Sequence, residues 1–231
     1  MGRLALFLLL LIPPSNPQGS NYNPAYHSDL YRFSERGVKN AYTSSVIVTA
    51  TMDNNGMSIG SGNYFHIHGH RFVLTAAHVV EGFPKLIITE RSGDLHEANI
   101  IYVDTALDIA ILKVKTILEF TKPIDYSPSK KPEIGKEIFY CGHPNQMYFT
   151  SYHGRISGFN GQYLLLDTFA WPGSSGSMVF NKEGQVVGTV SAISMDAPTG
   201  VPVLVPHFVR IGPTTKYTRK FILEILFNEY R

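Results

Sequence analysis

Three residue types that can cooperate in nucleophilic catalysis occur here in separate short motifs, in the order His78, Asp108 and Ser175. Ser175 lies between Gly173 and Gly176, and glycine allows backbone dihedral angles that residues with a Cβ avoid. A turn of this kind can aim backbone amides at one point, where they would stabilise an oxyanion. A serine hydroxyl also needs a base to take its proton, and a histidine held by a buried carboxylate suits that task.

The elements that must position these residues are predicted to be short strands. Apolar and β-branched runs recur at roughly the spacing of β-sandwiches and barrels. They lie at 44–51, 58–67, 71–75, 85–90, 98–103 and 109–114, and again at 136–141, 148–156, 163–168, 178–180, 185–192 and 201–209. The pattern predicts two all-β halves of about six strands each, with no internal repeat. His78 and Asp108 fall in the first half and Ser175 in the second, so a triad would assemble across the cleft between them.

The remaining segments divide the chain further. We expect a lead-in over 20–43, a first barrel over 44–120 and a second over 135–212. The proline-containing segment 121–134 is predicted to link them. Helical spacing of apolar residues begins only after Pro213, which predicts one C-terminal helix over 213–231.

Composition excludes several classes of protein. Hydrophobic residues make up 44% of the 231 residues, which is ample for a packed core. The net charge is +2 without a basic run, so nucleic acid is not indicated as a partner. Cys141 is the one cysteine, so no intramolecular disulfide can form, and we expect it to be a core residue.

The N-terminus predicts a secretory signal peptide over 1–19, and hence a secreted or extracytoplasmic protein. Arg3 is followed by an apolar run over 4–12, which is too short to span a bilayer as a helix. We therefore expect no stable membrane insertion. The alternative is an apolar leader of another origin, such as a fragment of a larger precursor.

Three motifs in this order resemble those of trypsin/chymotrypsin-like serine proteases, and within that superfamily the protease domain of HtrA-type enzymes. The resemblance covers about 44–211 and rests on Thr75-Ala76-Ala77-His78, Asp-Ile-Ala-Ile-Leu-Lys-Val over 108–114, the loop 167–177 and Tyr140-Cys141-Gly142-His143-Pro144. It implies two six-stranded antiparallel β-barrels of chymotrypsin type with the active site between them. It also implies cleavage of polypeptide substrates through an acyl-enzyme, without a cofactor or metal.

The resemblance assigns roles to individual residues. His78 becomes the general base, Asp108 its orienting acid and Ser175 the nucleophile. The oxyanion hole falls at Gly173, Ser174 and Ser175, with the amides of Gly173 and Ser175 as donors. Activity is expected to rise with pH as His78 loses its proton, because only a neutral imidazole can accept the serine proton.

The resemblance also locates a substrate pocket, whose base would lie at Phe169 and Ala170 and whose wall would be Ser191, Ala192 and Ile193. None of the five side chains is charged, so a buried charge on the substrate would find no partner. A β-branched residue at 193 should shorten the pocket. We therefore expect cleavage after small or aliphatic residues.

The chain departs from the family pattern in three places. Ser177 stands where the family usually has a second glycine, and a small residue should still fit there. Ser174 stands where vertebrate trypsin-like zymogens carry an aspartate, so we expect no activation cleavage. The 56 residues after Ser175 (231 − 175) are accounted for by the rest of the second barrel and the helix, so no PDZ domain is expected.

Alternative interpretations remain. The fold could serve as a binding or chaperone module with little or no proteolysis, although all three triad residues are present. Ser175 could instead belong to the Gly-x-Ser-x-Gly motif of an α/β-hydrolase, with Asp196 and His207 as the later triad members. Against this interpretation, residue 177 is serine where the motif ends in glycine, and no βαβ pattern precedes it. The alternating His66, His68 and His70 could bind a metal, but a polar hairpin tip without a metal is the preferred reading. The oligomeric state is left open, and a trimer is compatible with the resemblance.

Overall fold

The computed structural model describes residues 32–53, 56–196, 203–213 and 217–229, and the side chains of 192–216 and 228–229 lie outside that description. The expected signal peptide over 1–19 and the first part of the lead-in lie outside the described residues.

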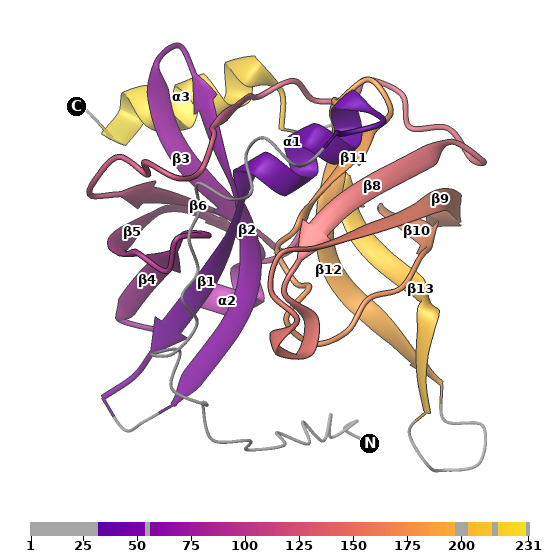
Figure 1. Ribbon diagram of the computed structural model, residues 1–231, viewed down its shortest axis with the longest axis horizontal. Helices are drawn as coiled ribbons and strands as arrows, with labels where there is room; N and C mark the ends of the chain where they lie inside the picture. Colours follow the sequence, from indigo (N-terminus) through magenta and orange to yellow (C-terminus); the bar gives the residue numbers. More distant parts are fainter. Residues whose placement is uncertain (1–31, 54–55, 197–202, 214–216, 230–231) are drawn as a thin grey trace.

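Six antiparallel strands form the first barrel (Figure 1). They are β1 (Ser45–Thr51), β2 (Met57–Ile67), β3 (His70–Thr75), β4 (Lys85–Thr89), β5 (Leu95–Asp104) and β6 (Ile109–Val114). Their spatial order is β1-β4-β5-β6-β3-β2, and the ring closes because β1 also pairs with β2, from Ser45 opposite Asn63 to Thr51 opposite Met57. Buried aliphatic residues that alternate along these strands, such as Val46, Val48 and Ala50 on β1, fill the interior.

Six more antiparallel strands form the second, closed barrel. They are β8 (Glu137–Gly142), β9 (Thr150–Asn160), β10 (Tyr163–Asp167), β11 (Met178–Asn181), β12 (Val186–Asp196) and β13 (Val203–Pro213), in the order β10-β13-β12-β11-β8-β9. The segment between the barrels adds β7 (Ile124–Asp125) parallel to β2, and Pro128 then bridges to Val186 of the second barrel. The predicted all-β fold of two six-stranded barrels is confirmed.

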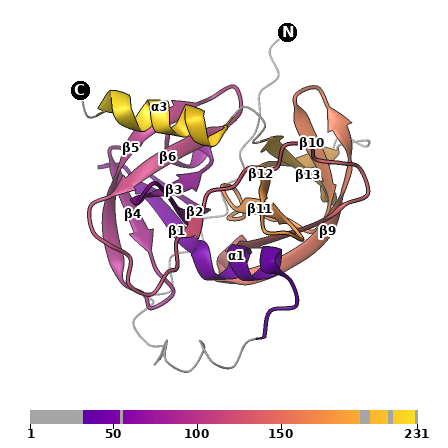
Figure 2. The ribbon, with the colours of Figure 1, turned by 90° about the horizontal axis from the view of Figure 1, so that it is seen from above.

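Three α-helices and one 3-10 turn, η2 (Pro144–Gln146), complete the described fold. The short α2 (Ala77–Val80) follows β3, and the predicted C-terminal helix is present as α3 (Arg219–Glu229). Figure 2 shows α3 lying along the first barrel, where Ile222 and Leu226 are buried. No helix of the described residues is long and apolar enough to cross a membrane.

The lead-in is more ordered than its sequence suggested, because it contains α1 (Arg36–Ser44). This helix packs mainly on β8 and β11 of the second barrel and also reaches β2 of the first (Figure 2). Its buried positions are Gly37, Ala41 and Ser44, which share one helix face. A Cβ on Gly37 would lie 2.2 Å from the carbonyl oxygen of Asn181, so only glycine allows this close approach.

Candidate active site

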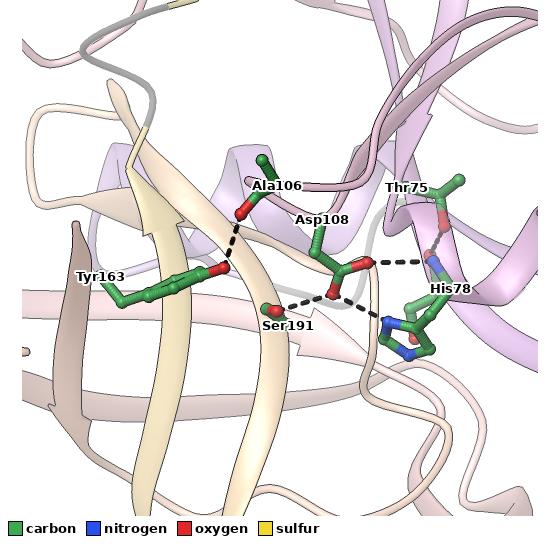
Figure 3. Close-up of polar contacts among 7 residues, drawn as sticks. Thr75, His78, Ala106, Asp108, Tyr163 and Ser191 are labelled. Atoms are coloured by element: carbon green, nitrogen blue, oxygen red, sulfur yellow. Dashed lines mark hydrogen bonds and ion pairs between the residues drawn. The ribbon is translucent and has the colours of Figure 1, made fainter. Parts of the chain in front are cut away.

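His78 lies in α2, just after β3, and Asp108 directly precedes β6, the strand that pairs with β3. The two residues contact each other at two points (Figure 3). The carboxylate oxygen Oδ2 of Asp108 lies 2.8 Å from Nδ1 of His78, and Oδ1 accepts the His78 backbone N–H at 2.9 Å. The backbone of Asp108 has φ +57°, in the left-handed region that a non-glycine residue rarely adopts. The two contacts fix the carboxylate relative to both the ring and the backbone of His78.

Ser191, on β12 of the second barrel, supplies a further hydrogen bond to the same carboxylate. Its hydroxyl donates to Oδ2 of Asp108 at 2.6 Å (Figure 3). Burial raises the pKa of Asp108, but the hydrogen bonds from His78 and Ser191 outweigh it, so the pKa lies below its ordinary value. An ionised carboxylate only accepts hydrogen bonds, so Nδ1 of His78 donates to it, and Nε2 is the ring nitrogen that this contact leaves available.

His78 and Asp108 differ in exposure. The side chain of His78 is 49% exposed, whereas that of Asp108 is 14% exposed. The imidazole can therefore meet a substrate, while the carboxylate behind it is shielded from water.

The turn that leads into Asp108 is stabilised by one hydrogen bond within the turn and by two from the second barrel. The Asp104 carboxylate accepts the backbone N–H of Leu107 at 2.9 Å. The carbonyl of Ala106 accepts a hydrogen bond from the Tyr163 hydroxyl of the second barrel at 2.7 Å (Figure 3). It accepts another from the Gln162 amide at 2.8 Å. The position of Asp108 therefore depends on both barrels.

Strand β2 contacts both the loop of Ser175 and the helix that carries His78. The Ser175 carbonyl accepts the backbone N–H of Ser61 at 2.7 Å. A Cβ on Gly60 would lie 2.6 Å from a methyl carbon of Val79 and 2.9 Å from the Ser175 carbonyl oxygen. Gly60 thus lies between Ser175 and the residue that follows His78, and its missing side chain allows the two loops to approach.

The loop 167–177, called the nucleophile loop here after the predicted role of Ser175, has two amides without a backbone partner among the described residues. The Ser174 amide donates to the Trp171 carbonyl at 2.9 Å and the Gly176 amide to the Val190 carbonyl at 2.8 Å. Within the described part of the chain, the amides of Gly173 and Ser175 donate to no carbonyl. Of the three residues predicted to form an oxyanion hole, Ser174 has an amide that closes a turn, whereas the amides of Gly173 and Ser175 have no such partner. The oxyanion hole itself stays a prediction.

Gly173 could not be another residue. It has φ +103°, and a Cβ there would lie 2.5 Å from the His143 carbonyl oxygen. His143 is itself buried, and burial lowers its pKa to about 3. Its Nδ1 accepts the Phe149 amide at 2.9 Å, so the neutral ring carries its proton on Nε2, 3.2 Å from the Ser45 hydroxyl. This histidine is a neutral structural residue beside the loop.

Ser177 fits in place of the usual glycine. Its side chain is fully buried, and its hydroxyl has no hydrogen-bond partner among the described residues. A Cβ on Gly142 would lie 2.7 Å from that hydroxyl, so glycine at 142 makes room for it.

The two residues expected at the base of the pocket differ in exposure. Ala170 is fully buried and packs in the core of the second barrel. Phe169 is 40% exposed, and its ring stacks on Tyr152 at 5.5 Å and on Trp171 at 6.4 Å. The position of the substrate pocket stays a prediction. Ala192 and Ile193 lie on β12, but their side chains are outside the described residues.

The other sequence candidates have structural positions. His68 and Gly69 form the turn between β2 and β3, as predicted for a hairpin tip. Cys141 is buried, and burial raises its pKa to about 11. Among the residues that the structure describes, no group of three His, Cys, Asp or Glu side chains could hold a metal ion.

Ser61 and Ser191 were not predicted as site residues in these roles. Serine within a strand has no distinctive sequence pattern. Their contacts depend on how the two barrels dock, which no local motif encodes.

Comparisons with known proteins identify the family of this chain. Residues 60–188 match the family model described as a trypsin-like peptidase domain. The serine endoprotease DegS of Salmonella typhimurium is 25% identical over 232 residues, which cover 89% of this chain and 64% of DegS. A protein of Halomonas elongata, named as a periplasmic DegP-like serine endoprotease, is 29% identical over 59% of this chain and 30% of its own length.

The fold is also found in a solved structure. The crystal structure of the serine endoprotease from Yersinia pestis superposes with a TM-score of 0.66 and 22% identity, over 84% of this chain and 66% of that one. The chain spans about a third to two thirds of the two relatives above. The matched family model covers more than half of the chain, including all three catalytic candidates, and the chain therefore belongs to the family of trypsin-like serine peptidases.

Proposed function

We propose that the chain is a serine endopeptidase that hydrolyses polypeptides through an acyl-enzyme, with His78, Asp108 and Ser175 as its triad. The observation that carries the proposal is the two-point contact of Asp108 with His78, which orients the ring and leaves Nε2 outside that contact. The alternative is a protease-fold binding or chaperone module without turnover.

Each residue has one task in this mechanism. The Ser175 oxygen attacks the carbonyl carbon of the scissile bond while its proton passes to Nε2 of His78. The Gly173 and Ser175 amides stabilise the oxyanion of the tetrahedral intermediate. Collapse of that intermediate breaks the C–N bond, and the leaving amine takes the proton from His78. Water then repeats the sequence on the acyl-enzyme, releases the acid and restores Ser175.

An activity-based probe separates the two functions. A fluorophosphonate should label the folded wild-type protein, and tandem mass spectrometry should map the label to Ser175. Ser174 and Ser177 in the same loop are internal controls, because both are fully buried and should stay unlabelled. Folded wild-type protein that takes up no label would support the binding-module alternative.

We also propose a preference for cleavage after small or aliphatic residues. Phe169, Ala170 and Ser191 carry no charge, so a charged substrate side chain would lose its hydration without gaining a partner. In such a pocket one methylene changes the rate by about 10- to 200-fold, so the preference should be broad. Cleavage of a peptide library should be dominated by Ala, Val, Ile and Leu before the cut bond, and dominance of Arg, Lys or Glu would contradict the assignment.

The proposed location is extracytoplasmic. It is supported by the apolar run at 4–12 and by the name of the Halomonas relative, which places that protein in the periplasm.

A further inference from the structure

We infer that Ser61, on the first barrel, is a positioning residue that sets the oxyanion hole on the second barrel. The inference rests on the proposed function and concerns its transition state. Ser61 lies on β2 and is fully buried. Its backbone N–H binds the Ser175 carbonyl at 2.7 Å, and its carbonyl accepts the Thr75 hydroxyl at 2.7 Å. The backbone of Ser61 is thus fixed between the strand that leads to His78 and the nucleophile itself.

The hydroxyl of Ser61 makes two further contacts, both with the second barrel. It donates to the Gly173 carbonyl at 2.7 Å and accepts the His143 backbone N–H at 3.1 Å. Gly173 carries one of the two free amides, and His143 begins the loop that packs against Gly173. One side chain therefore connects the two loops whose relative position defines the hole.

Peptide geometry explains why these contacts direct the Gly173 amide. In a trans peptide the C=O and the following N–H point in opposite directions. The Pro172 carbonyl accepts the Asn145 amide at 3.0 Å, so the Gly173 N–H points away from Asn145. The Gly173 carbonyl is held by Ser61, which fixes the next peptide plane. With φ +103° and no Cβ, Gly173 would otherwise turn easily between orientations.

Ser61 influences both peptide planes that flank Gly173. It holds the Gly173–Ser174 peptide directly, through the hydrogen bond to the Gly173 carbonyl. It influences the Pro172–Gly173 peptide through His143, because the bond to the His143 amide anchors the segment whose Asn145 amide binds the Pro172 carbonyl. Loss of the Ser61 hydroxyl would leave its backbone hydrogen bond to Ser175 in place. The Gly173 amide, the proposed oxyanion donor, would no longer be held in one orientation.

A purely structural role for Ser61 would affect stability alone, so the test compares two buried serines. Ser44 is also fully buried, and its hydroxyl donates to the Asn40 carbonyl at 2.6 Å and accepts the Asn63 amide at 2.8 Å. It therefore matches Ser61 in burial and in number of hydrogen bonds, but it does not touch the nucleophile loop. Ser44→Ala is the matched control for Ser61→Ala.

We expect Ser61→Ala to lower kcat by about 10- to 100-fold with little change in KM, because the oxyanion is stabilised mainly in the transition state. kcat should be expressed per Ser175 titrated by the fluorophosphonate, so that unfolded molecules do not count. A peptide trifluoromethyl ketone, whose adduct with Ser175 carries an oxyanion, should bind more weakly by a similar factor. Ser61→Cys, which retains a weak S–H donor, should lose less than Ser61→Ala.

A second measurement does not depend on catalysis. Exchange of the His143 amide hydrogen, followed by NMR, should be faster in Ser61→Ala than in Ser44→Ala, because the acceptor of that amide is removed. If Ser61→Ala matches Ser44→Ala in kcat, ketone affinity and exchange, the inference is overturned. A folded wild type that neither labels nor cleaves would instead refute the proposed function, and the exchange rate would still decide whether Ser61 holds the loop.

Discussion

Replacing Ser175 with alanine is expected to lower kcat by about a millionfold, the largest effect of any single change in this chain. The substitution removes the atom that forms the acyl bond, so no step of the proposed mechanism can proceed. The fold should be unaffected, because Ser175 is held through its carbonyl, which the alanine retains. Steady-state cleavage of the best library peptide measures the loss, and thermal unfolding checks the fold.

Ser177→Ala is the control for that experiment. It is the same substitution two residues away, and it removes a buried hydroxyl that has no partner among the described residues. Its kcat should stay within a few-fold of the wild type, and its stability should be equal or slightly higher, since an unpaired buried polar group costs about 1–3 kcal/mol. Residual activity above about one per cent in purified Ser175→Ala would mean that another group is the nucleophile.

Asp108→Asn should lower kcat by about 10⁴-fold, the second largest effect. An asparagine side chain can donate to Nδ1 of His78, which would then carry its lone pair there and its proton on Nε2. In that tautomer the ring cannot take the proton of Ser175. Asparagine also has one acceptor oxygen for the His78 amide and the Ser191 hydroxyl, which the two carboxylate oxygens serve together in the wild type.

The kinetics of Asp108→Asn should be compared with those of Asp125→Asn. Asp125 is more than half exposed and pairs with Arg219 at 2.6 Å, well outside the triad contacts. A surface pair of this kind is worth about 0–1 kcal/mol, so the control should keep nearly full activity. A loss of less than about tenfold in Asp108→Asn would remove the orienting role from Asp108.

The strands and the triad candidates were predictable because both depend on local pattern. β6 was predicted with its observed ends, since its run of apolar residues begins directly after Asp108. Several other strands extend beyond the predicted ranges, because their ends are set by pairing with neighbours. β12 reaches Asp196 opposite Val203, for example.

α1 was not predicted because its buried face consists of Gly37, Ala41 and Ser44. These small residues have helical spacing, but Ala41 is the one hydrophobic side chain among them. The helix is stabilised by close approach to β8 and β11, which depends on the tertiary fold. The roles of Ser61 and Ser191 were hidden for a related reason. Each contacts a group on the opposite barrel, and a sequence does not reveal how two barrels dock.

Hydrogen bonds join the two barrels at the site, so catalytic activity should depend on how the barrels are docked. Ser191 reaches from the second barrel to Asp108, and Ser61 reaches from the first barrel to Gly173. Neither barrel alone contains all the proposed catalytic groups, so the free energy that docks the barrels would also assemble the proposed triad and oxyanion hole. A slight opening of the interface would therefore abolish turnover while every strand remained paired within its own barrel.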